Sequence, residues 1–285
     1  MDTGSAGTLG SSQDLISYFE QCVQRFPKAI AYSQESKSLS FEDLDRLSGA
    51  LARYLRSHPD LHPGDRVAIQ LPNILAYPIA IWGVIRAGLV VVNTNPLYTA
   101  YETLKQLRDA EVKAWLCVES SAHLLDPVLQ ELSIPFVVIC ELFGLHPFYR
   151  RLPMEWMVRY KLGPMRKRTN HRVPTLRRIL RQGRKNSTPP FRAEPDDPVA
   201  FQYTGGYTGV LKAAVLTHRN FVANVQQIEA TMRTHIEPMH EHVLAPLPLY
   251  HIFGFTMHCL LPLGMGIRTI LVLDPTQIRR LIHIM

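Results

Sequence analysis

The chain has 285 residues, of which 46% are hydrophobic, and a formal net charge of +7. That composition supplies enough apolar material for a large core and one or two compact units. The four cysteines are scattered without a Cys-x-x-Cys pair. This disfavours a disulfide framework or a zinc site and favours free thiols in a reducing cytosol.

The sequence also argues against export and against a membrane span. Residues 1–12 are rich in Gly, Ser and Thr and lack the basic start and apolar core of a secretory signal. The longest apolar-rich stretch, residues 252–267, is broken by Pro262 and three glycines, which is not the pattern of a transmembrane helix. We therefore expect a cytoplasmic protein.

The first 140 residues alternate between helical and strand patterns. Apolar side chains recur at helical spacing from Leu15 to Phe26 and again from Phe41 to Leu55, where Ser40 is placed to cap the helix. Strands that alternate with helices predict an α/β fold whose parallel sheets are flanked by helices on both faces. The remaining elements, in chain order, are a turn at 62–65, a strand at 67–69, a helix at 74–86, a strand at 89–92, a helix at 101–109, a strand at 114–118, a helix at 122–132 and a strand at 136–139.

A strongly basic segment follows. Between Arg150 and Lys185 there are thirteen Lys or Arg residues and one acid, Glu155, with aromatic residues interleaved. This mixture favours a peripheral contact with anionic lipid headgroups, on the inner face of the cytoplasmic membrane. A solvated basic insertion is the alternative, and we expect no nucleic acid because no RNA- or DNA-binding motif accompanies the charges. Residues 187–198, rich in proline and acidic residues, are typical of a linker.

A glycine-rich stretch after the linker carries the clearest chemical signal. It lies between a strand predicted at 199–203 and a second apolar run at 213–216. Glycines let main-chain N–H groups approach a phosphate closely, hydroxyls add neutral donors, and a lysine adds positive charge. The spacing fits neither the Walker pattern nor the dinucleotide-binding fingerprint. It predicts a phosphate-binding turn between two strands, with an ordinary Gly/Thr hairpin turn as the alternative.

Beyond this turn, Thr217 is placed to cap a helix that carries Phe221 to Met232, a strand is expected at 269–273, and a helical pattern runs over 277–285. We divide the chain accordingly into a flexible N-terminus (1–13), a first α/β subdomain (14–145), a basic insertion and linker (146–198) and the start of a second α/β subdomain (199–285).

Together with three further blocks, the glycine-rich stretch resembles the signature of the acyl-adenylate-forming enzymes, and most closely the bacterial long-chain fatty acid–CoA ligases. The similarity runs in family order from about Asp14 to the last residue and corresponds to the N-terminal half of the family's fold. The three blocks are Leu71-Pro72-Asn73 with Tyr77-Pro78 and Arg86-Ala87-Gly88, then Asn93-Thr94-Asn95-Pro96-Leu97-Tyr98-Thr99, and finally Leu247-Pro248-Leu249-Tyr250-His251-Ile252-Phe253-Gly254.

The resemblance implies ATP-dependent activation of a long-chain fatty acid. The carboxylate attacks the α-phosphate of Mg-ATP to give acyl-adenylate and pyrophosphate, and the thiol of coenzyme A then displaces AMP. Donors aimed at the leaving pyrophosphate lower the barrier of the first step. In the family this role belongs to the glycine-rich loop, which corresponds here to Tyr203, Thr204, Gly205, Gly206, Tyr207, Thr208, Gly209 and Lys212.

The third block lies beside the carboxylate and acyl pocket in the family. The resemblance makes His251 the catalytic candidate, as the side chain that contacts substrate near the reacting phosphate. Without the family context, a histidine among Leu, Tyr, Ile and Phe is more often a satisfied core residue. The substrate-binding candidates implied by the resemblance are Tyr250, His251, Phe253 and Gly254.

Two departures from the family pattern bear on activity. Tyr207 stands where relatives carry a small hydroxyl residue, and we hypothesise that it weakens nucleotide binding. No residue after Pro275 resembles the family's later adenine-, ribose- and magnesium-binding motifs. No metal ligand is therefore assigned, and ATP and Mg²⁺ are expected from the resemblance alone. We expect no complete turnover from this truncated chain by itself. The alternative is a non-catalytic module that binds fatty acid or membrane, and a homo-oligomer is left open.

Overall fold

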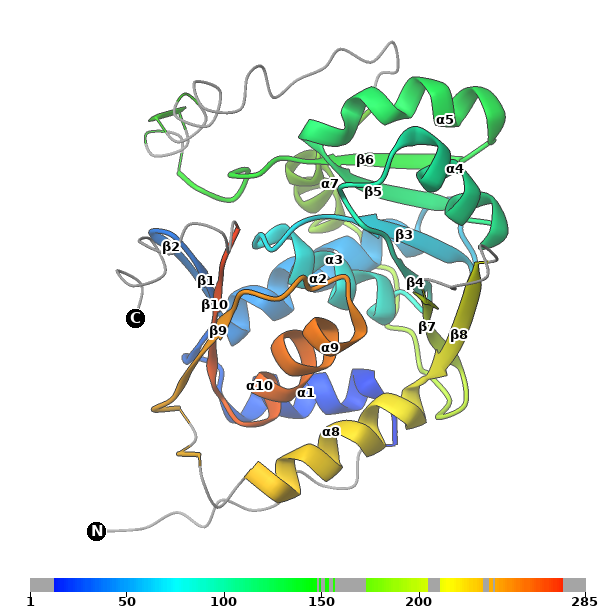
Figure 1. Cartoon of the computed structure of the whole chain (residues 1–285). Coiled ribbons are helices and arrows are strands. Elements are labelled where there is room, and N and C mark those ends of the chain that lie inside the picture. The colour runs from blue at the N-terminus through cyan, green and yellow to red at the C-terminus, as the bar shows by residue number, and fades with distance from the viewer. Residues whose placement is uncertain are drawn as a thin grey trace, which may run out of the picture.

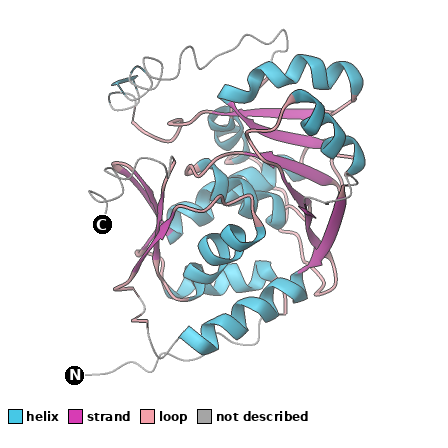
Figure 2. Cartoon of the chain, viewed as in Figure 1, coloured by secondary structure: helices cyan, strands magenta, loops and turns pink. Residues whose placement is uncertain are grey.

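The computed structural model describes residues 13–147, 149, 152–153, 156, 173–204, 211–232, 236–237 and 239–273. Within that part of the chain the strands form two separate sheets, which Figure 2 shows in magenta, and helices pack between and around them (Figure 1). The predicted α/β fold with sheets flanked by helices is confirmed. The predicted final helix over 277–285 and most of the basic segment lie outside the described residues.

The larger sheet has six strands in the order β6-β5-β3-β4-β7-β8. The strands from β6 to β7 run parallel, and β8 turns back antiparallel to β7 as the edge strand. The carboxyl ends of the parallel strands therefore meet at one edge, which is where open α/β sheets bind their ligands. The strands are β3 (Arg66–Gln70), β4 (Val90–Asn93), β5 (Ala114–Val118), β6 (Phe136–Cys140), β7 (Pro198–Thr204) and β8 (Lys212–Thr217).

The smaller sheet has four strands in the order β2-β1-β10-β9. Of these, only the strand near residue 269 was anticipated from the sequence. The β1–β2 hairpin was missed because its turn residue Glu35 adopts a positive φ of 52°, for which Gly or Asn is the usual sequence signal. The strands are β1 (Ile30–Gln34), β2 (Lys37–Ser40), β9 (His242–Ala245) and β10 (Arg268–Leu271).

Helices cover both faces of the six-stranded sheet. One face packs against α4 (Ala100–Asp109) and α5 (Leu125–Glu131), with a 3₁₀ turn at Glu119–Leu124 before α5. The helix expected at 122–132 is divided in this way because Pro127 lacks an N–H and is tolerated only in the first turn of an α-helix.

The other face packs into a larger core that includes the four-stranded sheet. The expected caps are present there: the Ser40 hydroxyl accepts a hydrogen bond from the main-chain N–H of Asp43, and the Thr217 hydroxyl accepts one from Asn220. The elements of this layer are α1 (Leu15–Arg25), α2 (Phe41–Arg56), α3 (Ala76–Arg86), α7 (Leu176–Gly183), α8 (His218–Met232), α9 (Ile252–Gly254), the π-helical turn η2 (Phe255–Leu260) and α10 (Leu261–Gly264).

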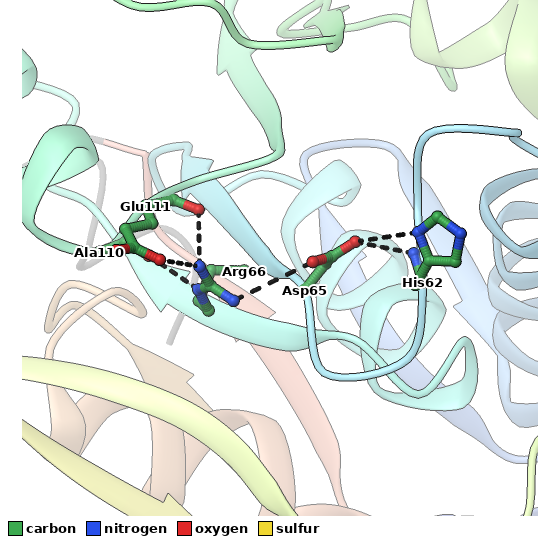
Figure 3. Close-up of polar contacts among 5 residues, drawn as sticks. All are labelled: His62, Asp65, Arg66, Ala110 and Glu111. Carbon is green, nitrogen blue, oxygen red and sulfur yellow. Dashed lines mark hydrogen bonds and ion pairs between the residues drawn. The ribbon is translucent and has the colours of Figure 1, made fainter.

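The turn expected before β3 forms at the amino edge of the six-stranded sheet (Figure 3). The carboxylate of Asp65 accepts a 2.7 Å hydrogen bond from the main-chain N–H of His62. The next residue, Arg66, donates to the carbonyl oxygens of Ala110 at 2.8 Å and Glu111 at 3.0 Å. These carbonyls directly follow the last residue of α4, so the guanidinium caps the C-terminal end of that helix and fixes it to the start of β3.

Strand pairing crosses the division into subdomains that we drew from the sequence. Strand β7, which begins after the linker, pairs with β4, and β10 pairs with β1 near the N-terminus. The order of strands in a sheet depends on which edges are free to pair, and this information is not contained in element-by-element patterns. The division into subdomains itself stays a prediction.

Candidate functional site

The glycine-rich turn joins β7 to β8 at the carboxyl edge of the six-stranded sheet. Thr204 and Lys212 are Cα partners at the end of this antiparallel pair where the turn connects the two strands, and both residues are exposed. The two strands expected on either side of the turn are therefore confirmed, and the phosphate-binding turn between them stays a prediction. The remaining residues predicted to contact phosphate lie outside the described residues, apart from Tyr203: Gly205, Gly206, Tyr207, Thr208 and Gly209.

Tyr203 directs its phenol to α4. The hydroxyl donates a hydrogen bond to the carboxylate of Asp109, the last residue of that helix. Burial raises the pKa of the Tyr203 phenol, and the hydrogen bond to Asp109 and its negative charge raise it further. The phenol is thus a neutral donor that anchors β7 to α4. We therefore expect any contact of Tyr203 with nucleotide to be made by its main chain.

The segment before His251 is held by Asn73. The side-chain nitrogen of Asn73 donates to the carbonyl oxygens of Ala245 and Leu247, each at 2.9 Å. Its side-chain oxygen accepts a 3.0 Å hydrogen bond from the main-chain N–H of Leu249. The side-chain amide of Asn73 is buried, and both its N–H groups and its oxygen form hydrogen bonds. Asn73 thus fixes the path of the chain after β9.

A second set of hydrogen bonds joins this segment to β7. The side chain of Gln202 donates to the carbonyl oxygen of Tyr250 at 3.4 Å and accepts from the side chain of Asn93 at 3.3 Å. The hydroxyl of Tyr77 lies 2.7 Å from the side-chain oxygen of Asn93 and 2.8 Å from the carbonyl oxygen of Leu249, and its single proton serves one of them at a time. The structure thus brings the strand of the glycine-rich turn next to the predicted substrate segment.

Tyr250 also approaches the second block of the resemblance. Burial raises the pKa of the Tyr250 phenol, and the nearby phenol of Tyr98 raises it further. Burial likewise raises the pKa of Tyr77, which is fully enclosed. All three sequence blocks therefore converge at this edge of the sheet, and the tyrosines among them are neutral at physiological pH.

His251 is exposed, which excludes the alternative of a satisfied core histidine. Its main-chain N–H donates to Pro248 at 3.1 Å, and its carbonyl oxygen accepts from Phe255 at 2.8 Å at the start of α9. Among the described residues, no hydrogen bond is found for its imidazole. The ring is consequently free to contact a substrate.

The next two candidates, Phe253 and Gly254, differ in their exposure. The ring of Phe253 is 53% exposed, so it is available to an apolar ligand. Gly254 is buried, and an added Cβ would overlap the carbonyl oxygen of Pro248. Its role in the structure is the close packing of α9 on the preceding segment, and a substrate contact of Gly254 stays a prediction.

No group of three or more His, Cys, Asp or Glu side chains among the described residues is arranged to hold a metal ion. The Mg²⁺ expected from the resemblance therefore has no ligand assigned in this part of the chain.

Sequence reasoning gave no functional role to Asn73, Tyr77, Asn93 or Gln202. The first three lie in the blocks that carry the resemblance, whereas Gln202 lies in the strand before the turn. The available signal was the presence of amide and phenol groups in apolar runs, because such groups must find hydrogen-bond partners when buried.

Comparison with known proteins gives a consistent result across the chain. The AMP-binding enzyme family matches residues 19–284. Long-chain-fatty-acid–CoA ligases of Escherichia coli O6:H1 and Haemophilus influenzae are each 36% identical, over 95% and 96% of this chain. The chain spans about half the length of these relatives, 48% and 50% respectively.

Solved structures share the fold. The apo structure of Mycobacterium smegmatis MbtA matches with a TM-score of 0.76 at 21% identity, covering 95% of this chain and 46% of that one. A long-chain-fatty-acid-CoA ligase, FadD1 from Archaeoglobus fulgidus, matches with a TM-score of 0.74 at 19% identity, covering 94% of this chain and 48% of that one. At these identities the likeness concerns the fold alone.

Proposed function

Because the chain belongs to the AMP-binding enzyme family, we propose that it carries the N-terminal half of a ligase that activates a long-chain fatty acid. ATP converts the acid to acyl-adenylate, and coenzyme A then takes the acyl group. The names of the curated relatives support this substrate class. The chain spans about half the length of those relatives, so the activity of the whole ligase is part of the proposal.

One observation carries the proposal: the contact between β7 and the segment that contains Tyr250 and His251. The side chain of Gln202 donates to the carbonyl oxygen of Tyr250, so the strand entering the glycine-rich turn lies against that segment. A nucleotide with its phosphates on the turn would have the exposed imidazole of His251 and the ring of Phe253 on the neighbouring segment.

The chemistry of the first step suits this arrangement. As the carboxylate attacks the α-phosphate, negative charge builds on the leaving pyrophosphate. In the proposal the N–H groups of the turn, the hydroxyl of Thr204 and the ammonium of Lys212 donate to those oxygens. His251 donates to the carboxylate or α-phosphate oxygen, which keeps the reacting atoms in line.

ATP–pyrophosphate exchange in the presence of a long-chain fatty acid tests the proposal. We expect exchange that depends on the fatty acid and falls at least tenfold in Lys212→Ala and in His251→Ala, in line with the loss of a transition-state donor. Lys113→Ala is the matched control, because Lys113 is exposed at the start of β5, near the amino edge of the same sheet.

The opposite result favours the non-catalytic module. Saturable binding of a fatty acid without any exchange, in the chain alone and after addition of the C-terminal half of a relative, would contradict the ligase proposal. Exchange only after that addition would support the proposal and identify where the missing groups reside.

We also propose that the basic segment contacts an anionic membrane surface. Helix α7 buries Leu176, Ile179 and Leu180 and exposes Arg177, Arg178 and Arg181. Tyr149 and Trp156, earlier in the same segment, are exposed at 70% and 71%. Exposed arginines and exposed aromatic rings are both side chains that suit an interface of anionic headgroups and acyl chains. No helix in the described ranges is both long enough and apolar enough to cross a bilayer.

Vesicle binding tests this second proposal. The triple change of Arg177, Arg178 and Arg181 to Glu should abolish binding to vesicles that contain phosphatidylglycerol. Arg108→Glu, on the exposed surface of α4, should leave it intact. Equal binding of the triple variant and the unchanged protein would refute the membrane contact.

A further inference from the structure

The Leu71-Pro72-Asn73 block has no role in the proposed reaction, yet Asn73 makes the most complete set of contacts to the substrate segment. Its two amide protons and one oxygen lone pair are all used, on Ala245, Leu247 and Leu249, at 2.9 to 3.0 Å. The residue is 6% exposed. Distances this short, from a buried amide, indicate a rigid attachment.

The attachment joins the two sheets. Asn73 follows β3 of the six-stranded sheet, and Ala245 is the last residue of β9 in the four-stranded sheet. The chain then passes through Pro248, which has no N–H, to the buried Leu249, whose N–H is satisfied by Asn73. The stretch between β9 and α9 thus takes its position from a side chain of the other sheet.

We propose that Asn73 is a positioning residue that holds the segment of Tyr250 and His251 against β7. By fixing Ala245 to Leu249, it delivers the carbonyl oxygen of Tyr250 to Gln202 and leaves the imidazole of His251 exposed next to β7. The catalytic consequence rests on the proposed function, because it concerns the adenylation step. The attachment itself is independent of any ligand.

Tyr77 supports the same stretch from the following helix. Its hydroxyl lies 2.8 Å from the carbonyl oxygen of Leu249. Asn73 accepts from the N–H of the same residue, so the two side chains hold adjacent peptide groups. Loss of Asn73 therefore removes its three hydrogen bonds and leaves the stretch attached through Tyr77 and Gln202. We expect local mobility between β9 and α9 and no loss of the fold.

Amide hydrogen exchange without ligand tests the attachment directly. In Asn73→Ala, exchange within residues 245–255 should rise about tenfold or more while the strands of both sheets keep their protection. Asn73→Asp keeps the acceptor for Leu249 and loses both donors, so the Leu249 amide should stay closer to its original rate. Asn186→Ala is the matched control, since Asn186 makes a single surface bond to Ser57.

Two outcomes of that experiment would overturn the inference. One is unchanged exchange over 245–255 in Asn73→Ala. The other is a uniform rise across the whole chain, which would mean that Asn73 serves global stability and holds no particular segment. Thermal unfolding of the same variants separates the local effect from the global one.

ATP–pyrophosphate exchange tests the effect of Asn73 on catalysis. Asn73→Ala should lower the maximal rate on the order of 10²-fold, as displacement of a reacting group does, with the KM for ATP within about twofold of the original. A parallel rise in KM without a fall in rate would contradict a positioning role. If the unchanged protein shows no exchange, the proposed function fails, and the hydrogen-exchange result alone decides the role of Asn73.

Discussion

Gln202 and Tyr250, 48 positions apart in the sequence, are joined by a hydrogen bond of 3.4 Å from a side-chain amide to a main-chain carbonyl. The same amide accepts from Asn93 at 3.3 Å, so one buried side chain of β7 touches the ends of two other structural segments. Both bonds are long, and each contributes less than a bond at 2.9 Å.

Gln202→Leu should destabilise the fold by about 1 kcal/mol or slightly more, because it leaves the amide of Asn93 and the carbonyl of Tyr250 without a partner. Urea unfolding measures the change. Gln202→Glu keeps the acceptor for Asn93 but places a carboxylate against the carbonyl oxygen of Tyr250 in a buried site, so it should cost at least as much. Equal stability of all three proteins would mean that the long bonds carry no net free energy.

Tyr203→Phe separates the two possible roles of Tyr203. The phenol donates to Asp109 on α4, so its removal should cost up to about 1 kcal/mol of stability. The affinity for ATP should not change, because the side chain is directed away from the segment that contains His251. Calorimetric titration with ATP checks this, and a weaker affinity would show that the hydroxyl contacts the nucleotide.

Tyr207→Thr tests the departure from the family pattern in the glycine-rich turn. If the turn binds phosphate as proposed, a small hydroxyl side chain at this position adds a donor and takes up less space than a phenol ring. We expect ATP to bind about tenfold more tightly, the effect of one added hydrogen bond to a charged group. Equal affinity before and after the change would refute the hypothesis.

Arg66→Ala should destabilise the protein by about 1–2 kcal/mol, because two carbonyls at the end of α4 lose their donor. Arg108→Ala is the comparison, since the ion pair of Arg108 with Glu131 is exposed on both sides and should contribute at most a few tenths of a kcal/mol. Chemical unfolding of both variants gives the difference. Equal losses would show that the cap adds nothing beyond an ordinary surface pair.

Stability should fall as the pH decreases below about 6.5, the ordinary pKa of histidine. Burial lowers the pKa of His218 and of His258 in the folded protein; for His218, Asp14 and Asp197 oppose the effect without cancelling it. The unfolded state therefore binds more protons in this range, so stability is fully present above pH 6.5 and is lost as the pH falls through the folded pKa values.

His218→Asn isolates one of these groups. In the structure, Nδ1 of His218 accepts a 3.1 Å hydrogen bond from the main-chain N–H of Leu15. An Asn side chain can still accept this bond, but it cannot titrate. The loss of stability between pH 7.5 and pH 5 should be smaller in this variant, whereas the exposed His240→Asn should behave like the unchanged protein. Identical pH profiles for all three would exclude His218 as a source of the acid sensitivity.

The spacing of apolar residues predicted the helices and strands that bury one continuous face. The helix from Leu15 and the capped helix from Phe41 were expected within a residue or two of their observed bounds, and the strand at 114–118 was expected as it is found. The β1–β2 hairpin was missed because its turn is made by Glu35 at positive φ, and the short β9 offers only four residues of pattern.

The candidate site residues were selected from the sequence for a different reason, and their roles stay predictions. The resemblance selected His251, Phe253 and the two ends of the glycine-rich turn, all of which the structure leaves exposed. It gave no role to Asn73 or Gln202. Their partners lie 172 to 176 and 48 positions away, and no local pattern encodes hydrogen bonds across such separations.

Strand β8 forms the border of the six-stranded sheet and shares a ladder with β7 alone. Its residues are largely accessible, with Val215 at 52% exposure. Because β8 pairs on one side only, it can separate from the sheet while the five parallel strands keep their pairing and their packing against the helices. Opening of this border therefore costs the main-chain hydrogen bonds of one strand pair only.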